Sequence, residues 1–199
     1  MTRRLERFLD GTDVAYRGEH YRWSTIDVVE VPASHAVVIR SEGDIPFSEM
    51  VQYFTQADPF EAFVEAERLV RTETPLTWWY LNDDGGRPAP GANPVREPFR
   101  FEVGYEIVDP GPARRAPSDS VGEYLTRPEP ARRVARVFYQ GSFPHQEHSG
   151  FADAFMTLVQ RADEGAFSLT GRMYREVYHV HDAADPSRCV TEFQVEIER

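Results

Sequence analysis

An internal repeat limits the folds that this sequence can adopt. The segment that begins at Pro32 recurs 98 residues later at Pro130, and the two copies keep one register over fifteen residues. Toward the end of each copy the spacing falls to 90 residues, where residues 102–107 match residues 192–197. Such a chain consists of two similar units that bury their apolar faces together. The other matching pairs are Ala33 with Ala131, Gly43 with Gly141, Ile45 with Phe143, and Pro46 with Pro144.

Each copy shows the pattern of a strand, a helix and two further strands, which predicts the α+β class. Residues 28–39 and 133–139 are rich in apolar and β-branched residues, as strands are. Residues 99–107 and 192–197 alternate between apolar and polar side chains, so each of these strands has one apolar face. We expect a helix to cover that face. Four carboxylates then share the opposite face: Glu102, Glu106, Glu192 and Glu196.

The helices are predicted from apolar residues at helical spacing. In the second copy this spacing runs from Phe151 to Val159, and Gly165 stands where the helix is expected to stop. In the first copy, residues 50–54 and 60–70 show the same spacing, but Asp58-Pro59 separates them. Since proline disfavours a continuous helix, we expect a helix in two parts there.

The repeat also sets the expected domain boundaries. The first copy carries eight extra residues, which we place in an irregular loop at residues 83–95 because this stretch contains Asp-Asp-Gly-Gly and three prolines. The expected units are an N-terminal extension (1–25), the first repeat (26–108), an internal connector (109–131) and the second repeat (132–199).

Charge and cysteine content exclude some classes of partner and site. The net charge is −11 and all 22 basic residues are arginine, so we expect no nucleic acid or membrane to bind through a basic face. The single cysteine, Cys189, excludes an internal disulfide and a thiolate metal cluster. There is no apolar run long enough for a signal peptide or a membrane span, and we expect a cytoplasmic location.

The second copy contains Arg175-Glu176-Val177-Tyr178-His179, followed by a turn-rich stretch and by Thr191-Glu192. These motifs resemble the GyrI-like (gyrase-inhibitor-like) ligand-binding family, which also serves as the effector domain of multidrug-sensing MerR-type and AraC-type regulators. Residues 130–135 resemble that family's opening strand, and residues 101–104 resemble the strand that closes its first half. The resemblance covers residues 26–197.

The resemblance implies a concave antiparallel sheet made by both copies, with two helices on its convex face and a ligand groove at the pseudo-twofold axis. Only 25 residues precede the first copy, too few for a helix-turn-helix domain. We therefore expect a stand-alone sensor, carrier or enzyme whose partner is a small organic molecule. A homodimer is left open.

Carboxylates and aromatic residues are the candidate binding groups. An acidic floor with aromatic walls would select a planar or lipophilic cation by charge pairing and cation–π attraction. The alternatives are that Glu192 and Glu102 are surface carboxylates, that Tyr178 is a core aromatic, and that Arg175 and Glu176 form a cross-strand ion pair. Trp78, Trp79 and Tyr80 cannot all face one side. The candidate ligand-binding residues are Glu192, Glu102, Tyr178, Tyr174, Trp78, Trp79 and Tyr80.

The sequence gives little support for a metal site or a cofactor site. His145 and His148 form one pair and His179 and His181 another, but zinc needs three or four ligands and the pairs lie in different elements. The sequence has no phosphate-binding glycine loop, no nucleophile elbow and no dinucleotide fingerprint. We expect neither a metal nor a cofactor.

Three functions remain. The leading hypothesis is reversible binding of an amphipathic or cationic small molecule for sensing or sequestration. The second is hydrolysis of reactive cyclopropane-type compounds, as in stand-alone proteins that this chain resembles in length and duplication, with Glu192 as the base and Tyr178 as the proton donor. The third is inhibition of an enzyme such as gyrase through a protein–protein contact.

Overall fold

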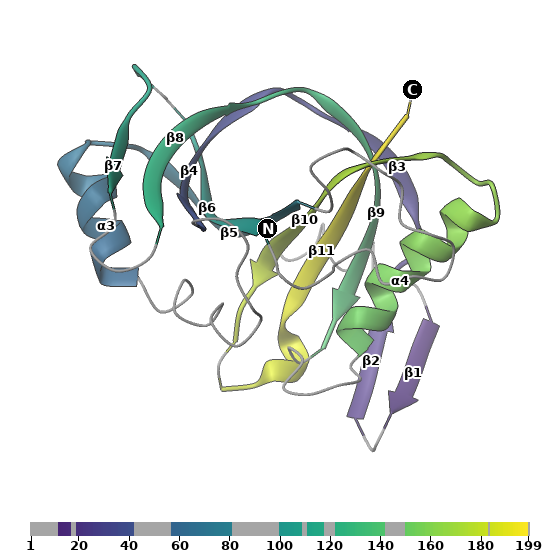
Figure 1. Cartoon of the computed structure of the whole chain (residues 1–199). Coiled ribbons are helices and arrows are strands. Elements are labelled where there is room, and N and C mark those ends of the chain that lie inside the picture. The colour runs from purple at the N-terminus through teal and green to yellow at the C-terminus, as the bar shows by residue number, and fades with distance from the viewer. Residues whose placement is uncertain are drawn as a thin grey trace.

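Within residues 12–16, 19–41, 57–80, 100–108, 111–117, 122–141, 150–182 and 184–198, the computed structural model describes one large antiparallel sheet. The strands are β1 (Thr12–Tyr16), β2 (Glu19–Trp23), β3 (Asp27–Val31), β4 (Ser34–Arg40), β5 (Arg71–Tyr80), β6 (Arg100–Ile107), β7 (Arg115–Pro117), β8 (Glu123–Glu129), β9 (Arg132–Gln140), β10 (Leu169–Val180) and β11 (Val190–Ile197). Their order is β1-β2-β9-β11-β10-β5-β6-β4-β8-β7, and β3 also pairs with β9. Figure 1 shows the sheet curved into an arch.

In the described part of the chain, two α-helices lie outside the arch (Figure 1), α3 (Ala57–Ala66) and α4 (Gly150–Asp163). Pro59 lies in the first turn of α3, where its missing N–H would have no partner within the helix. The helix predicted in the second copy is confirmed by α4, and Gly165 follows it with a φ of +81°, a conformation that favours glycine and ends helices. A short 3₁₀ helix, η2 (Pro186–Arg188), precedes β11.

The predicted order of elements is confirmed, as β4-α3-β5-β6 in the first copy and β9-α4-β10-β11 in the second. The α+β class and the concave antiparallel sheet are confirmed as well. The first part of the broken helix, predicted at residues 50–54, and the loop predicted at residues 83–95 lie outside the described residues.

The strand that precedes each copy pairs with a strand of the other copy. The single strand predicted at residues 28–39 is divided at Pro32-Ala33 into β3 and β4, because proline cannot donate to a strand ladder. The division at Pro130 between β8 and β9 is equivalent. β3 pairs with β9 of the second copy, and β8 pairs with β4 of the first copy. The segment expected as a connector thus supplies a strand that joins the copies.

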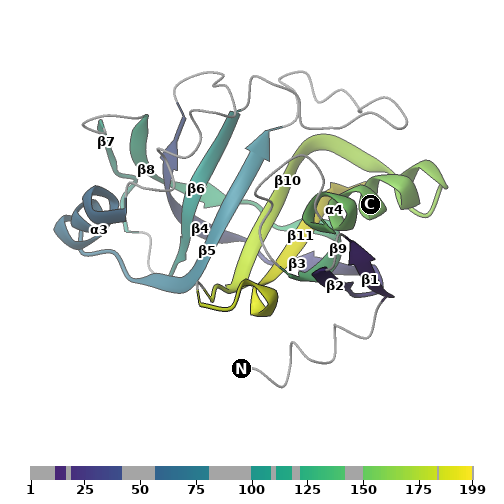
Figure 2. The ribbon, with the colours of Figure 1, turned by 90° about the horizontal axis from the view of Figure 1, so that it is seen from below.

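Alternation places the core on one side of the sheet. We call the side that packs on the helices the helix face; it carries Phe101, Ile107, Phe193, Val195 and Ile197 in the main buried cluster. The opposite side, here called the inner face, lines the inside of the arch. Figure 2 shows α3 and α4 near opposite ends of the sheet, with β5 and β10 between them. No helix in the described part of the chain is long and apolar enough to cross a membrane.

A close approach of two strands requires glycine at position 104 of β6. A Cβ there would lie 2.0 Å from the Val37 carbonyl oxygen and 2.8 Å from the Val38 Cα. We therefore expect Gly104→Ala to lower the free energy of unfolding by about 2 kcal/mol, because backbone atoms of β4 must move.

Urea unfolding measures this loss. The matched variant Gly165→Ala has open space around the added Cβ and only an unfavourable φ, so it should lose about 1 kcal/mol. Equal losses of unfolding free energy in both variants would show that the backbone of β4 moves at little cost to make room for the added Cβ.

Candidate functional site

The strand register divides the predicted site residues between the two faces. On the inner face, Trp78 lies opposite Glu102 and also opposite Arg175. On the helix face, Trp79 lies opposite Tyr174. Tyr80 and Glu192 belong to the inner face, because Tyr80 contacts Glu102 and Glu192 lies opposite Val177. Tyr178 belongs to the helix face, where it contacts Thr77 and Glu176.

Glu102 is the centre of a buried ionic network on the inner face. Its side chain is fully buried and accepts hydrogen bonds from Arg40 Nε and Arg127 Nε, each at 2.5 Å, and from the Tyr80 hydroxyl at 2.8 Å. Burial and the adjacent Glu102 charge raise the pKa of Tyr80, so this hydroxyl keeps its proton. The protein itself therefore supplies the cations for Glu102.

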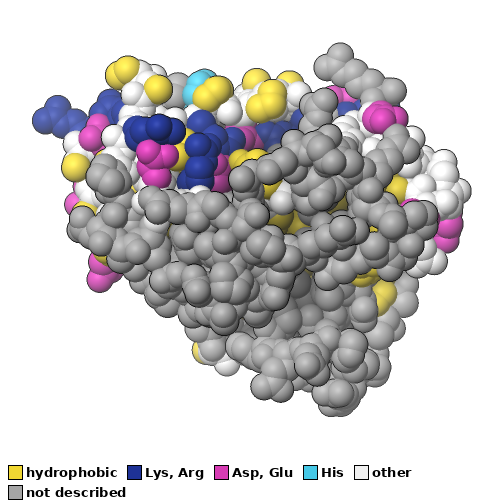
Figure 3. Space-filling view, viewed as in Figure 1, with side chains coloured by type: hydrophobic (Ala, Val, Ile, Leu, Met, Phe, Trp, Pro, Cys, Tyr) yellow, Lys and Arg dark blue, Asp and Glu magenta, His cyan; other side chains and the backbone are white. Residues whose placement is uncertain are grey.

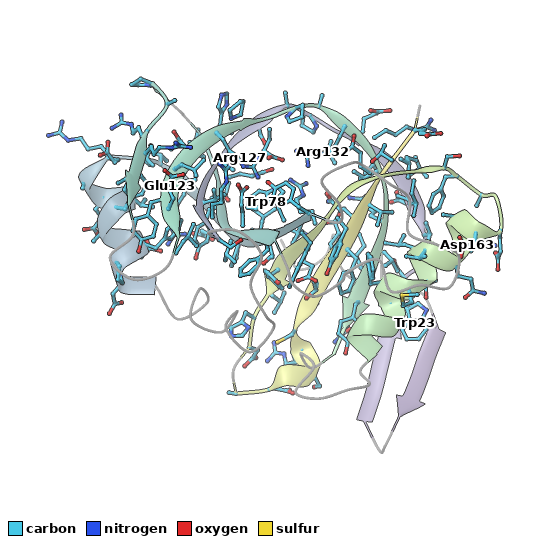
Figure 4. All side chains as sticks on the ribbon, viewed as in Figure 1. Trp23, Trp78, Glu123, Arg127, Arg132 and Asp163 are labelled. Atoms are coloured by element: carbon cyan, nitrogen blue, oxygen red, sulfur yellow. The ribbon has the colours of Figure 1, made fainter. Side chains whose placement is uncertain are left out.

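The same network encloses Trp78. The Trp78 indole donates to Glu129 Oε2 at 3.2 Å, and the Arg127 guanidinium lies 5.0 Å from the centre of its ring. Glu129 also forms ion pairs with Arg127 and Arg132. Figure 4 shows Trp78, Arg127 and Arg132 together inside the arch, and in Figure 3 basic and acidic side chains gather at the upper left of the molecule.

Glu192 has its own partners on the inner face. Its carboxylate contacts His179 Nε2 at 2.7 Å, Gln194 Nε2 at 2.7 Å and Arg136 Nη1 at 3.3 Å. Burial would raise the pKa of Glu192, but His179, Gln194 and Arg136 together hold it below the usual value. This carboxylate is ionised and already compensated, so these contacts favour a structural role over cation binding.

Glu176 is the carboxyl group that lacks such compensation. It lies on β10 of the helix face, is 3% exposed, and accepts a hydrogen bond from the Tyr178 hydroxyl. Within the described part of the chain, no Arg or His side chain forms an ion pair with it. Burial raises the pKa of Glu176 from 4.5 to about 7, although donors from Tyr178, Trp79 and Tyr174 oppose the rise. Near neutral pH this carboxyl group is therefore poised between its two forms.

Aromatic rings surround Glu176. Trp79 stacks on Tyr174 with ring centres 5.6 Å apart and planes 11° apart, and Phe155 of α4 packs on Tyr174 at 4.3 Å. Thr77 is fully buried and its hydroxyl lies 3.0 Å from that of Tyr178. We call these residues, Glu176, Tyr178, Tyr174, Trp79 and Thr77, the Glu176 cluster. It lies on β5 and β10, the two strands between the helices (Figure 2).

The Glu176 cluster is located at the seam between the two copies. Thr77 lies opposite Val103, and Glu176 lies opposite Phe193. Val103 and Phe193 are equivalent by the repeat match of the final strands, so Thr77 and Glu176 are equivalent too. They pair directly with each other across β5 and β10. The pseudo-twofold axis therefore passes between them, and the second copy alone places a carboxyl group there.

An ion pair of Glu176 with Arg175 was one alternative from the sequence, and the structure differs from it. Arg175 points to the inner face, where Nε donates to Gln194 at 2.9 Å and Nη1 contacts Glu106 at 3.3 Å. Adjacent residues of a strand point to opposite faces, so Glu176 goes to the other side. The pattern Tyr174-x-Glu176-x-Tyr178 is the signal that could have identified this site from sequence.

The structure also bears on metal binding. Among the described residues, no group of three or more His, Cys, Asp or Glu side chains is arranged to hold a metal ion. His179 is bound to Glu192, while His145 and His148 lie outside the described residues.

Several solved structures share this fold. The EcmrR C-terminal domain matches with a TM-score of 0.63 at 17% identity, over 88% of this chain and 98% of that chain. EcmrR in a complex with DNA matches with a TM-score of 0.62 at 17% identity, over 90% of this chain but only 58% of that longer chain. SAV2435 bound to tetraphenylphosphonium matches with a TM-score of 0.55 at 10% identity, over 87% and 94% of the two chains.

A hydrolase encoded by lin2189 from Listeria innocua matches with a TM-score of 0.51 at 9% identity, over 87% of this chain and 91% of that chain. No protein-family model matches the sequence, and no curated protein matches it. At these identities the similarity concerns the fold alone.

Proposed function

We propose that this chain, which has the GyrI-like fold, binds amphipathic organic cations at the Glu176 cluster for sensing or sequestration. The observation that carries the proposal is a buried carboxyl group, Glu176, that is enclosed by aromatic side chains and has no cationic partner among the described residues. The ligand would supply the missing positive charge.

Physical chemistry narrows the class of ligand. An ionised carboxylate away from water is unfavourable unless a positive charge or several donors face it. A small inorganic cation would lose its hydration shell on entering an aromatic site, whereas a lipophilic cation buries apolar surface and gains cation–π attraction to Trp79 and the tyrosines. A single carboxylate at the pseudo-twofold axis suits one positive charge.

One structural neighbour supports the class of ligand, and another shows the fold within a longer chain. SAV2435 is described with bound tetraphenylphosphonium, a lipophilic organic cation of the class inferred here. The EcmrR C-terminal domain is part of a longer chain that is described in a complex with DNA, so the same fold occurs there beside other segments.

Calorimetric titration with tetraphenylphosphonium tests the proposal. At about pH 8 we expect Glu176→Gln to weaken binding by roughly 30-fold, because the charge pair is lost in a site that excludes water. The matched variant Glu192→Gln changes an equally buried carboxylate on the inner face and should stay within about threefold of wild type. A large loss in Glu192→Gln with none in Glu176→Gln would move the site to the inner face.

The structure also favours a second function, hydrolysis of an electrophilic small molecule. A carboxyl group whose pKa is about 7 is well suited to take a proton from water, and the adjacent Tyr178 hydroxyl can donate one to the opening ring. Burial and Glu176 raise the pKa of Tyr178, which keeps this donor protonated. The acid–base pair is then Glu176 with Tyr178, because Glu192 lies on the other face.

Turnover of cyclopropane-containing electrophiles decides between binding and hydrolysis. An enzyme should form a hydrated, ring-opened product, and both Glu176→Gln and Tyr178→Phe should reduce its rate at least about 100-fold. Recovery of each bound compound unchanged would exclude the hydrolase and leave the binding role.

A further inference from the structure

We infer that Thr77 is a positioning residue that holds the Tyr178 hydroxyl on the Glu176 carboxylate and so favours the ionised, cation-binding form of Glu176. The inference rests on the proposed cation binding and deepens it, because it assigns control of the site's charge to a residue of the first copy. The role of Thr77 is open to a test without ligand.

The direction of the hydrogen bonds supports this role. Tyr178 has one hydroxyl proton and donates it to Glu176 Oε2. The 3.0 Å contact between Thr77 Oγ1 and the Tyr178 oxygen must then use the Thr77 proton. The chain of donation therefore runs from Thr77 to Tyr178 to Glu176. A phenol that accepts a hydrogen bond is a stronger donor to its own acceptor, since consecutive hydrogen bonds polarise one another.

Burial makes this series of hydrogen bonds effective. Thr77 is fully buried and Glu176 is 3% exposed, so neither group exchanges its partner freely for water. Thr77 and Glu176 are direct cross-strand partners on β5 and β10, which fixes their separation through the backbone. Without the Thr77 hydroxyl, the half-buried Tyr178 oxygen would lose the hydrogen bond from Thr77, and the Tyr178 O–H could turn about its C–O bond away from Glu176.

The surroundings of Glu176 leave few other groups to set its charge. On β10 the titratable neighbours are Tyr174 and Tyr178, which stay protonated because burial raises the pKa of both. β5 contributes Thr77 and Trp79, β11 places Phe193 opposite Glu176, and Phe155 of α4 packs on Tyr174. Among the described residues, no charged side chain shares this face with Glu176 at contact distance. Donors, and not charges, therefore oppose the effect of burial.

The experiment compares wild type with Thr77→Val, which removes the hydroxyl and keeps the shape. Carbon-13 NMR of glutamate-labelled protein follows the Glu176 carboxyl, identified by the signal that Glu176→Gln lacks. We expect Thr77→Val to raise the titration midpoint of Glu176 by about half a unit, and to weaken tetraphenylphosphonium binding at about pH 6 roughly threefold. Above about pH 9 the affinity of the two proteins should converge.

Two further variants complete the test. Thr77→Ser keeps the hydroxyl and should restore the wild-type midpoint. Thr191→Val changes another buried threonine, opposite Tyr178 on β11, that makes no hydrogen bond to Tyr178 or Glu176, and it should leave the midpoint unchanged. Unfolding curves confirm that each variant is folded.

An unchanged midpoint in folded Thr77→Val, or equal shifts in Thr77→Val and Thr191→Val, would overturn the role of Thr77. If wild type fails to bind tetraphenylphosphonium at any pH, the proposed function fails, but the NMR titration still decides whether Thr77 controls the charge of Glu176. The two failures are therefore distinguishable.

Discussion

At about pH 8 the variant Glu176→Gln should be more stable than wild type by roughly 3 kcal/mol, although it removes the group that we place at the centre of the site. Burial raises the pKa of Glu176 from 4.5 to about 7 in the folded protein. Between these values the folded state holds a proton that the unfolded state has lost, so stability falls as pH rises through this window. Each unit of pKa difference corresponds to about 1.4 kcal/mol.

Urea unfolding at about pH 4 and pH 8 measures this effect. Both proteins should have similar stability near pH 4, where Glu176 is largely protonated in the folded and unfolded states, and Glu176→Gln should gain its advantage between about pH 4.5 and pH 7 and keep it at higher pH. Glu192→Gln is the control of opposite sign, because the lowered pKa of Glu192 adds stability above the unfolded pKa that is lost in acid. A Glu176→Gln variant that is less stable than wild type at about pH 8 would show that the carboxylate is compensated in a way the structure does not contain.

Replacing Glu102 with Gln should lower the free energy of unfolding by about 4 kcal/mol. Glu102 is fully buried and compensates both Arg40 and Arg127, and it is also the acceptor of the Tyr80 hydroxyl. Removal of its charge leaves Arg127, whose side chain is 15% exposed, to share the Glu129 carboxylate with Arg132. Removing one partner of a buried ion pair is far more harmful than removing both.

The surface pair of Arg161, in the last turn of α4, and Glu164, directly after it, provides the matched control. Their side chains are 54% and 44% exposed, so Glu164→Gln should change stability by less than about 0.5 kcal/mol. Urea unfolding compares the two variants. A loss below about 1 kcal/mol in Glu102→Gln would mean that Arg127 finds another partner, and that the inner-face network is not a rigid support for the site.

These predictions assign different roles to the two faces of β10. On the inner face, Arg175 contacts Gln194 of the second copy and Glu106 of the first. These polar contacts hold β10 in place on the side opposite to Glu176. On the helix face, the next residue, Glu176, accepts a hydrogen bond from the Tyr178 hydroxyl and forms no ion pair with a described residue. The charges of the inner face thus compensate one another, whereas the helix face carries one carboxyl group that has no ion-pair partner among the described residues.

The sequence predicts the elements and the faces of single strands well. Alternation in β6 and β11 is strict because one face of each strand packs on helices and the other meets polar groups, so Phe101 and Glu102 could be assigned to opposite faces. The helix α4 could also be predicted, because its apolar spacing is followed by Gly165, and the structure shows this glycine with a positive φ.

The sequence does not predict how neighbouring strands align. Tyr178 and Glu192 were grouped as one site, but the register pairs Glu192 with Val177, which places the two side chains on different faces. Register is set by the packing of the whole sheet and not by the pattern within one strand. The partners of Glu102 could not be predicted from the sequence either, because Arg40 and Arg127 come from strands that are distant from β6 in the sequence.

The most direct test of the central claim, that an organic cation binds against Glu176, is the number of protons released on binding. Calorimetric titration with tetraphenylphosphonium at about pH 6.5, in two buffers with different ionisation enthalpies, measures this number. With a pKa of about 7 for Glu176, a bound cation should expel about 0.8 proton, and Glu176→Gln should expel none. Tight binding by wild type without proton release, or with release that persists in Glu176→Gln, would contradict the claim.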